Sequence, residues 1–374
     1  MPGLGKHKRQ RPMKFVVCMD SFKGSMSSLQ AGDAVRRGIL RAHPDAEVTV
    51  IPLADGGEGT LDAVAPYING IKRNLSVTGP LGNPVDAEYI YSEETRTAYI
   101  EMAKAAGLTL IKETELNPLL ATTYGVGELM KDAVMTGAKN LAICIGGSAT
   151  NDGGAGMLQA LGARLLDENG NIIGPGAAGL KELHSIDTSG LSTEGINITV
   201  ASDVTNPLCG PEGASMIYGP QKGASEEDCR VMDGYLMHFA DVAGLDPFEP
   251  GTGAAGGLGF ALMNFLGADL KPGADMVIEI TGAEHLIRDC DIVITGEGRI
   301  DSQTLSGKGP YRIMKTGTKC GKDVFGITGI PGEGCEECIA AGFKRIVPLI
   351  TPSMVTEEAT ASLEETAEAL SRSL

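Results

Sequence analysis

The sequence contains no tryptophan, few aromatic side chains and few positive charges. Aromatic residues make up 4% of its 374 residues, and 31 Lys and Arg stand against 48 Asp and Glu, which gives a formal net charge of −17. Binding to nucleic acid requires clustered basic side chains, so this balance excludes nucleic acid as the main partner. A small anionic substrate stays compatible with it, because such a substrate needs only a few local cations.

Long apolar runs are also missing. No stretch reaches the ~20 residues that a transmembrane helix needs, and the basic residues at positions 6–11 are not followed by the apolar segment of a signal peptide. Of the eight cysteines only Cys335 and Cys338 form a Cys-x-x-Cys, and no second pair follows at zinc-site spacing. We therefore expect a cytoplasmic protein with reduced thiols, no membrane contact and a disordered basic tail over residues 1–13.

Glycine, by contrast, is abundant at 52 residues, and the chain is longer than a single core of ordinary size accommodates. Apolar runs followed by a polar loop and helical periodicity occur twice before residue 70 and three times after residue 286. Such β–α units predict a doubly wound, five-stranded parallel sheet built from residues 14–70 and 287–374. The expected strands are residues 15–19, 48–53, 291–295, 323–327 and 345–350.

The middle of the chain, residues 71–286, has a different pattern. Residues 71–101 read as strands in hairpins, and the apolar runs 141–145 and 196–201 predict further strands between helices. We expect this part to form an inserted mixed α/β domain.

One stretch of the insert, residues 141–156, combines a strand with an unusual loop. The apolar run Leu141–Ile145 stops at Gly146-Gly147, and Ser148, Thr150, Asn151 and Asp152 follow within five residues before Gly153-Gly154. A glycine-rich loop lets a ligand approach the backbone closely, so this stretch favours a phosphorylated or hydroxylated ligand. The alternative is an ordinary turn between a strand and a helix.

Other polar loops follow the expected strands. Ligands of open parallel sheets bind beyond the carboxyl ends of the strands, so these loops are candidates for one shared cleft. Carboxylates with hydroxyls suit Mg²⁺, and Lys23, Lys222 and Arg299 could hold phosphate or a substrate carboxylate. Together these groups fit phosphoryl transfer, in which positioning and charge stabilisation do most of the catalysis. The loops are residues 20–25, 55–60, 296–304 and 328–332, with 146–154, 203–206 and 219–223 from the insert.

Three other kinds of site are disfavoured. Residues 251–256 match Gly-x-Gly-x-x-Gly, but two prolines precede them where a dinucleotide-binding fold has a buried strand. Residues 306–309 lack the upstream glycine and the final Ser or Thr of a Walker A loop. None of the five histidines lies in a candidate loop, which argues against serine-hydrolase chemistry.

Six multi-residue motifs occur together and in order, and with them residues 14–370 closely resemble the type I glycerate kinase family. The motifs are Asp20-Ser-Phe-Lys-Gly-Ser25, Leu53-Ala-Asp-Gly-Gly-Glu-Gly-Thr60, Gly146-Gly-Ser-Ala-Thr-Asn-Asp-Gly-Gly154, Ser202-Asp-Val-Thr-Asn-Pro207, Gly219-Pro-Gln-Lys-Gly223 and Thr295-Gly-Glu-Gly-Arg-Ile-Asp301. The resemblance implies a flavodoxin-like domain with an inserted mixed α/β domain. It also implies ATP-dependent phosphorylation of D-glycerate with Mg²⁺, to 2-phosphoglycerate. Apart from the resemblance, we expect a monomer or homodimer.

We assign hypothetical roles to the loop residues on this basis. Asp203 is the first choice for the general base because it ends a buried strand, and Lys23 would neutralise charge on the transferred phosphoryl group. Magnesium would be held by Glu297 and Asp301, or by Asp55. The expected substrate-binding residues are Ser148, Asn151, Asp152, Asn206, Arg299 and Lys222. The expected nucleotide-binding residues are Ser21, Gly24, Ser25, Gly56, Gly57, Gly296 and Thr304.

Two alternatives stay open at this point. The chain could phosphorylate another short hydroxy-acid, or it could be a two-domain binder of such an acid without enzymatic activity. An assay with glycerate, ATP and Mg²⁺ separates a kinase from a binder.

Overall fold

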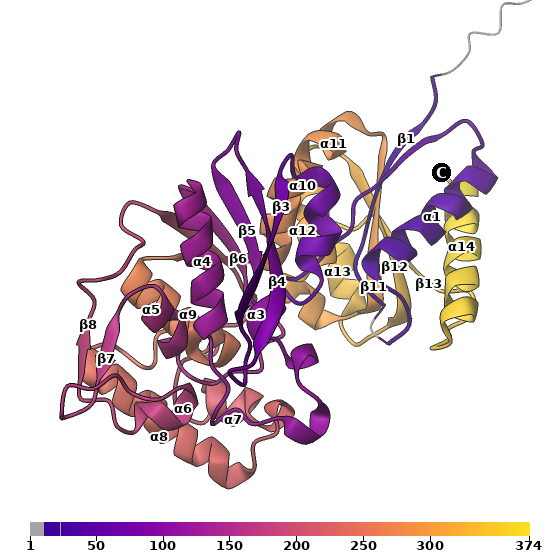
Figure 1. The fold of residues 1–374 in the computed structure, drawn as a ribbon. Coiled ribbons are helices and arrows are strands. Elements are labelled where there is room, and N and C mark those ends of the chain that lie inside the picture. Colours follow the sequence, from indigo (N-terminus) through magenta and orange to yellow (C-terminus); the bar gives the residue numbers. More distant parts are fainter. Residues whose placement is uncertain (1–10, 23) are drawn as a thin grey trace, which may run out of the picture. The chain divides into compact units, whose positions relative to one another are not determined.

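The computed structural model describes residues 11–22 and 24–374, and the chain divides into two compact units (Figure 1). Unit 1 contains the described residues up to Ala54 and Ile278–Leu374; unit 2 is the continuous segment Asp55–Val277. The sequence placed the two junctions near residues 70 and 286. The predicted basic tail lies largely outside the described residues, as does Lys23.

Unit 1 contains a five-stranded parallel sheet in the order β2-β1-β11-β12-β13. This is the strand order 2-1-3-4-5 of flavodoxin-like folds, so the predicted fold class is confirmed. From β1 the strands are added first toward one edge of the sheet, at β2, and then toward the other, from β11 onward. In such folds ligands bind at the carboxyl ends of the two strands where the order reverses, here β1 and β11. The strands are β1 (Lys14–Met19), β2 (Glu47–Val50), β11 (Ile292–Ile300), β12 (Asp323–Pro331) and β13 (Arg345–Pro348).

Helices cover both faces of this sheet because β1 is apolar on both sides. Phe15, Val17 and Met19 pack with α1 and α14, and Val16 and Cys18 pack with α11–α13. Helices α1 and α14, from opposite ends of the chain, lie side by side (Figure 1). The helices are α1 (Ser28–Ala42), α11 (Ala283–Asp289), η5 (Ser302–Ser306), α12 (Gly309–Lys319), α13 (Cys335–Ala341) and α14 (Thr356–Arg372).

Unit 2 contains a six-stranded mixed sheet in the order β10-β9-β6-β5-β4-β3. Strands β3, β4 and β5 pair antiparallel, as the hairpin pattern predicted, and β5, β6, β9 and β10 pair parallel. The carboxyl ends of β6 and β9 therefore meet at one edge. The strands are β3 (Ile71–Thr78), β4 (Pro84–Ser92), β5 (Thr97–Glu101), β6 (Asn140–Cys144), β9 (Asn197–Ala201) and β10 (Asp269–Lys271), with a separate pair β7 (Arg164–Leu166) and β8 (Ser185–Asp187).

The helices of unit 2 are mostly short, and two of them matter for the site. Helix α8 begins where the sequence predicted, at a capping box in which Ser225 and Asp228 bond each other's backbone N–H groups. Helix α9 begins with a left-handed turn at Ala255, Gly256 and Gly257. The helices are α2 (Thr60–Val64), η1 (Ala65–Tyr67), α3 (Ala103–Ala106), η2 (Leu108–Leu110), η3 (Glu113–Glu115), α4 (Tyr124–Thr136), α5 (Ala155–Ala160), α6 (Gly176–Leu180), α7 (Ala214–Tyr218), η4 (Pro220–Lys222), α8 (Glu226–Ala243) and α9 (Ala254–Leu266), and α10 (Gly273–Thr281) leads back into unit 1.

Two expectations about local structure were wrong. Strands β11 and β12 continue to Ile300 and Pro331, whereas the sequence predicted loops from Gly296 and Thr328. The two segments pair with each other as far as Ile300 and Pro331, so backbone hydrogen bonding extends strands whose glycines predict a loop. None of the helices within residues 11–22 and 24–374 is long and apolar enough to cross a membrane.

Candidate functional site

Unit 2 contains a pocket of about 250 Å³. Its walls come from the loops that follow β6 and β9, from the loop before α2, and from α7, η4 and the start of α9. Because β6 and β9 are neighbouring parallel strands, their following loops meet at the same edge of the sheet. The lining residues are Asp55, Gly56, Gly57, Ile145, Gly146, Gly147, Ser148, Ala201, Ser202, Asp203, Val204, Tyr218, Gln221, Lys222, Ala254 and Ala255.

Glycines bring two of these loops into backbone contact. The N–H of Gly146 donates to the carbonyl oxygen of Gly56 at 3.0 Å, and a Cβ at Gly146 would lie 2.5 Å from the Cα of Gly57. Gly56 has φ +82°, and a Cβ there would lie 2.9 Å from that of Ala201. The glycines are therefore needed because they let the two loops pack against each other at the pocket. The sequence analysis had explained the glycine-rich pattern by the close approach of a ligand.

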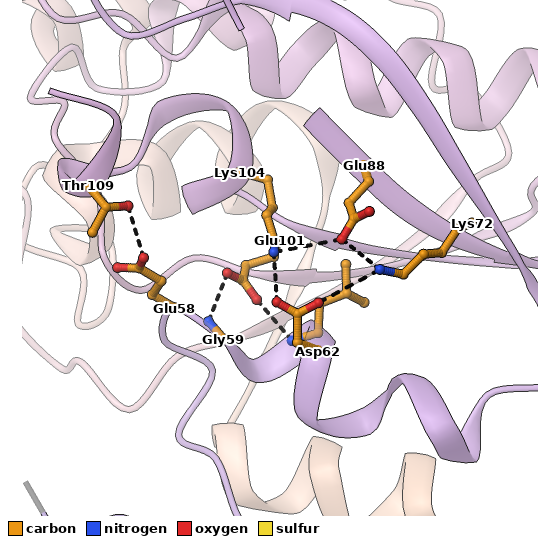
Figure 2. Close-up of polar contacts among 9 residues, drawn as sticks. Glu58, Gly59, Asp62, Lys72, Glu88, Glu101, Lys104 and Thr109 are labelled. Carbon is orange, nitrogen blue, oxygen red and sulfur yellow. Dashed lines mark hydrogen bonds and ion pairs between the residues drawn. The ribbon is translucent and has the colours of Figure 1, made fainter. Parts of the chain in front are cut away.

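A buried carboxylate holds the loop that contains Gly56 and Gly57. Glu101, at the end of β5, is 1% exposed and accepts hydrogen bonds from the backbone N–H groups of Gly59 and Leu61, both at 2.9 Å (Figure 2). Burial is the main cause that raises the pKa of Glu101. Sequence reasoning missed this residue; the available signal was an acidic side chain in an otherwise apolar strand.

Charged side chains surround that anchor. Lys104 contacts Asp62 at 2.7 Å and Glu88 at 3.7 Å, and Lys72 contacts Glu88 at 2.9 Å (Figure 2). Glu58, one residue before Gly59, accepts a hydrogen bond from the hydroxyl of Thr109 at 2.9 Å. The loop before α2 is thus fixed from two sides.

Lys222 is the most buried charged group of the pocket, at 1% exposure. Its Nζ lies 2.8 Å from the Oγ of Ser148 and 2.6 Å from the carbonyl oxygen of Thr150. Burial lowers the pKa of Lys222 to about 7, and Asp152 partly opposes that shift. The structure thus brings together two residues that the sequence predicted for substrate binding, Ser148 and Lys222.

Asp203, Asp55 and Asn206 lie at or near the same pocket. Asp203 and Asp55 line it with exposed side chains, and the Oδ1 of Asp203 accepts a hydrogen bond from the N–H of Gly273 at 3.2 Å. Asn206 does not line the pocket; its Oδ1 accepts a hydrogen bond from the hydroxyl of Tyr218 at 2.8 Å. Asn206 therefore contacts a residue of the pocket lining, Tyr218, which sequence reasoning did not select.

Two predicted substrate-binding residues lie behind the pocket. Asn151 has no exposed surface, and its Nδ2 donates to the Oγ of Ser215 at 2.7 Å. Asp152 is equally buried and accepts hydrogen bonds from the backbone N–H groups of Thr123, Gly154 and Gly156, and from the Thr123 hydroxyl. Burial raises the pKa of Asp152, although these bonds oppose the shift. Its position indicates a role in holding the start of α5.

Unit 1 gathers carboxylates at the ends of β1 and β11. Glu297 is buried, and its Oε1 accepts a hydrogen bond from the hydroxyl of Thr304 at 2.8 Å. Burial raises the pKa of Glu297, and the nearby charges of Asp20 and Asp301 add to the rise. Lys308 lies 3.8 Å from the other carboxylate oxygen.

Arg299 and Asp301 extend this cluster toward solvent. The Nε of Arg299, whose side chain is 67% exposed, lies 3.2 Å from the Oδ2 of Asp301. Asp301 also caps η5 by accepting a hydrogen bond from the N–H of Gln303. At Gly296 a Cβ would collide with the carbonyl oxygen of Ile327, so this predicted nucleotide-binding glycine is also required by the sheet.

The loop after β1 carries three more of the predicted nucleotide-binding residues. The N–H of Ser21 donates to Asp20 Oδ1 at 2.6 Å, and Gly24 has φ +79°. The Oγ of Ser25 is buried and has no hydrogen-bond partner among the described residues, while its carbonyl oxygen accepts from Thr356. An unsatisfied buried hydroxyl suits a ligand with additional hydrogen-bonding atoms.

The two alternative sets of predicted metal ligands belong to different units. Glu297 and Asp301 lie in unit 1 and Asp55 in unit 2, and within the described ranges no group of three or more His, Cys, Asp and Glu is arranged to hold a metal ion. Glu297 nevertheless fits Mg²⁺, because it is crowded by two other carboxylates. Protein-bound Mg²⁺ takes one or two carboxylates and completes its shell with waters and substrate phosphates.

Comparison with known proteins agrees with this geometry. The model of the glycerate kinase family matches residues 15–374. The chain is 46% identical over 354 residues to the glycerate kinase of Bacillus subtilis (strain 168), covering 93% of each chain. It is 49% identical over 324 residues to the glycerate 2-kinase of Escherichia coli (strain K12), covering 85% of each. A crystal structure assigned to a glycerate kinase 2 of Salmonella typhimurium LT2 is similar with a TM-score of 0.83 and 42% identity, over 97% of this chain and 98% of that one. The chain therefore belongs to the glycerate kinase family, and it is a transferase with glycerate kinase activity.

Proposed function

We propose that the enzyme transfers the γ-phosphoryl group of ATP to D-glycerate and yields 2-phosphoglycerate, in a cleft between the two units. The pocket of unit 2 is the observation that carries this proposal. At about 250 Å³ it is smaller than the pockets of drug-sized ligands, and Lys222 on its wall suits a small organic anion. The position of the phosphoryl group on the product follows the printed name of the Escherichia coli relative.

In unit 2, the substrate hydroxyl would give its proton to Asp203. This carboxylate is exposed on the pocket wall, and the N–H of Gly273 holds one of its oxygens. Ser148 and Lys222 would bind the carboxylate of the substrate. Asn206 would orient Tyr218 toward the substrate, because the two side chains share a hydrogen bond.

In unit 1, the loop after β1, strand β11 and the following η5 would bind the nucleotide. Ser21, Gly24 and Ser25 come from the loop, Gly296 from β11 and Thr304 from η5. Phosphate binding fits the carboxyl ends of β1 and β11, where the strand order of an open α/β sheet reverses. The unsatisfied hydroxyl of Ser25 supports this placement.

Glu297 and Asp301 would hold Mg²⁺ together with Asp20, whose charge acts on Glu297. When bound, this ion neutralises charge on the phosphate oxygens. Arg299 is exposed and would bind a phosphate. Lys23 would neutralise charge on the transferred phosphoryl group, as the sequence predicts. Water would have to be kept from the phosphoryl group during turnover, as a kinase requires.

The test is a phosphorylation assay with the full chain, Mg²⁺, ATP and D-glycerate, with the product identified by ³¹P NMR. We expect transfer to the 2-hydroxyl, no activity without Mg²⁺ and far lower activity with L-glycerate. Faster turnover with tartronate or threonate would favour the alternative, a kinase for another short hydroxy-acid. Binding of D-glycerate with no transfer to any of these acids would contradict the proposed reaction.

A further inference from the structure

The buried ammonium of Lys222 has only neutral hydrogen-bond partners. Its Nζ contacts the hydroxyl of Ser148 and the carbonyl oxygen of Thr150, at 2.8 and 2.6 Å. In the part of the chain that the structure describes, no carboxylate forms an ion pair with it. Buried charges in proteins are normally paired, because an unpaired one loses its hydration without compensation.

The carboxylate that influences the pKa of Lys222 forms its hydrogen bonds with other groups. Asp152 accepts hydrogen bonds from Thr123, Gly154 and Gly156, so its oxygens serve the backbone around α5. Asp55 and Asp203 also line the pocket, but they are exposed to solvent, and the charge that acts on Lys222 is that of Asp152. Tyr218 is the remaining titratable side chain of the lining, and burial raises its pKa.

A ligand bound in the pocket could supply the negative charge that Lys222 lacks. Lys222 and Ser148 both line the pocket, so a ligand placed there reaches the same hydroxyl that holds the ammonium. An anion placed beside a buried lysine favours its charged form, whereas an uncharged polyol does not.

We propose that the carboxylate of the substrate is the missing counter-ion of Lys222, and that its binding makes Lys222 take up a proton from solvent. This inference rests on the proposed function, because it takes D-glycerate as the ligand of the pocket. The proton bonds to Nζ and converts the amine to an ammonium, while the carboxylate keeps its charge. Lys222 then selects a hydroxy-acid over the corresponding polyol and links substrate affinity to pH.

The direction of the pH dependence follows from linkage. Because burial lowers the pKa of Lys222 to about 7 in the free pocket, the side chain is charged below this pH and binding takes up no proton. Above it the free side chain is neutral, while the bound anion keeps it protonated. The affinity for D-glycerate should therefore fall by about tenfold per pH unit above about pH 7, until the pKa of the bound state is reached.

Isothermal titration calorimetry of the full chain with D-glycerate at pH 8, in HEPES and in Tris, measures this uptake. We expect uptake approaching one proton per bound D-glycerate, in the absence or presence of the Mg²⁺ complex of a non-hydrolysable ATP analogue. Lys222→Arg, which stays charged, should bind with almost no uptake. Lys222→Met should bind at least about tenfold more weakly. Lys131→Met, at an exposed lysine of the same unit, should behave as the wild type. Glycerol should neither bind measurably nor cause uptake.

The wild-type chain alone can overturn the inference, so it does not depend on a variant that folds. Binding at pH 8 without proton uptake, an affinity constant between pH 6.5 and 8.5, or no binding with or without the nucleotide analogue would each do so. The same uptake in Lys222→Met would also contradict it. These failures differ from a failure of the proposed function, which is read from phosphoryl transfer at pH 7. An enzyme that phosphorylates D-glycerate without uptake refutes only the role of Lys222.

Discussion

The pocket of unit 2 and the carboxyl edge of unit 1 differ in the sign of the charge that each buries. The pocket encloses Lys222 among neutral acceptors and leaves Asp55 and Asp203 exposed. The edge of unit 1 buries Glu297 near Asp20 and Asp301, and the nearby cations Arg299 and Lys308 keep 67% and 41% of their side chains exposed. A buried cation suits an organic anion, and crowded carboxylates suit a metal–nucleotide complex. The comparison therefore predicts that substitutions in the two units affect different ligands.

The largest expected effect is on turnover, from Asp203→Asn in unit 2. Loss of a general base lowers kcat by about 10²–10⁴-fold, with little change in thermal stability because Asp203 is exposed. Steady-state kinetics and binding of Mg²⁺-ATP are the measurements, and nucleotide affinity should not change. Asp246→Asn, at another exposed loop carboxylate, is the matched control. Near-normal turnover would refute the assignment of the base.

The reciprocal substitution in unit 1 is Glu297→Gln. We expect the apparent affinity for Mg²⁺ to fall by about tenfold or more, because one carboxylate charge is lost, while binding of D-glycerate is unchanged. A titration of activity against Mg²⁺ measures the first effect and calorimetry the second. Glu284→Gln, at a partly exposed glutamate of unit 1 that pairs with Arg288 and Lys319, should change neither. Weakened binding of D-glycerate alone would reverse the comparison.

The stability of Glu297→Gln also has a predicted pH dependence. The pKa of Glu297 is raised in the folded state, so this group makes the wild type more stable as the pH falls through its folded pKa toward its ordinary value. Glutamine lacks that term and keeps an oxygen for the hydroxyl of Thr304. The variant should melt above the wild type at pH 8, and the difference should shrink toward pH 5. A difference independent of pH would exclude the buried charge as its cause.

A smaller effect on function is expected from Glu101→Gln, because Glu101 belongs to unit 2 but does not line the pocket. The amide can accept from only one of the two N–H groups of Gly59 and Leu61, so the unfolding free energy should fall by about 1–3 kcal/mol. Displacement of the loop with Gly56 and Gly57 should also lower kcat/KM for D-glycerate by about 10- to 100-fold. Chemical denaturation and kinetics measure the two effects. Glu88→Gln, at a partly buried carboxylate of the same network (Figure 2), should leave kcat/KM within about twofold, because Glu88 pairs with Lys72 and Lys104 rather than with the backbone of the loop.

The smallest effect is expected from Glu364→Gln, between α1 and α14. Glu364 is 8% exposed and contacts Arg37 and Arg41, which are about half exposed and stay hydrated without it, so the loss should be about 1–2 kcal/mol. Neither ligand affinity should change. A change in the affinity for D-glycerate or for Mg²⁺-ATP would show that ligand binding depends on the packing of α1 against α14.

Much of the fold could be predicted from the sequence, because apolar runs and helical periodicity report burial directly. Strand β10 could not be predicted, since Asp269-Leu-Lys271 is held by pairing with β9 and has only one apolar residue. The left-handed turn at Ala255 also escaped prediction. A Cβ at the neighbouring Gly256 would collide with the carbonyl oxygen of Thr150, so tertiary contact restricts this turn.

The candidate site was predictable in composition and less so in detail. The motifs identified Ser148 and Lys222, but they carry no information on which charges lack a partner. Asp152 shows the limit most clearly: in sequence it is one more polar residue of a glycine-rich loop. In space its carboxylate bonds to Thr123, about thirty positions earlier in the chain. Only the folded chain determines whether such a side chain points toward a ligand or toward its own backbone.

The division of unit 1 between the two ends of the chain has a consequence for biosynthesis. Strand β1 pairs on one side with β2 and on the other with β11, which begins at Ile292. During translation its second edge therefore stays without a partner until roughly three-quarters of the protein has left the ribosome. The continuous segment Asp55–Val277 can fold first, while the apolar strand β1 still has one unpaired edge. The nascent enzyme is thus most exposed to aggregation before β11 emerges, and a chaperone that binds extended apolar segments would act at that stage.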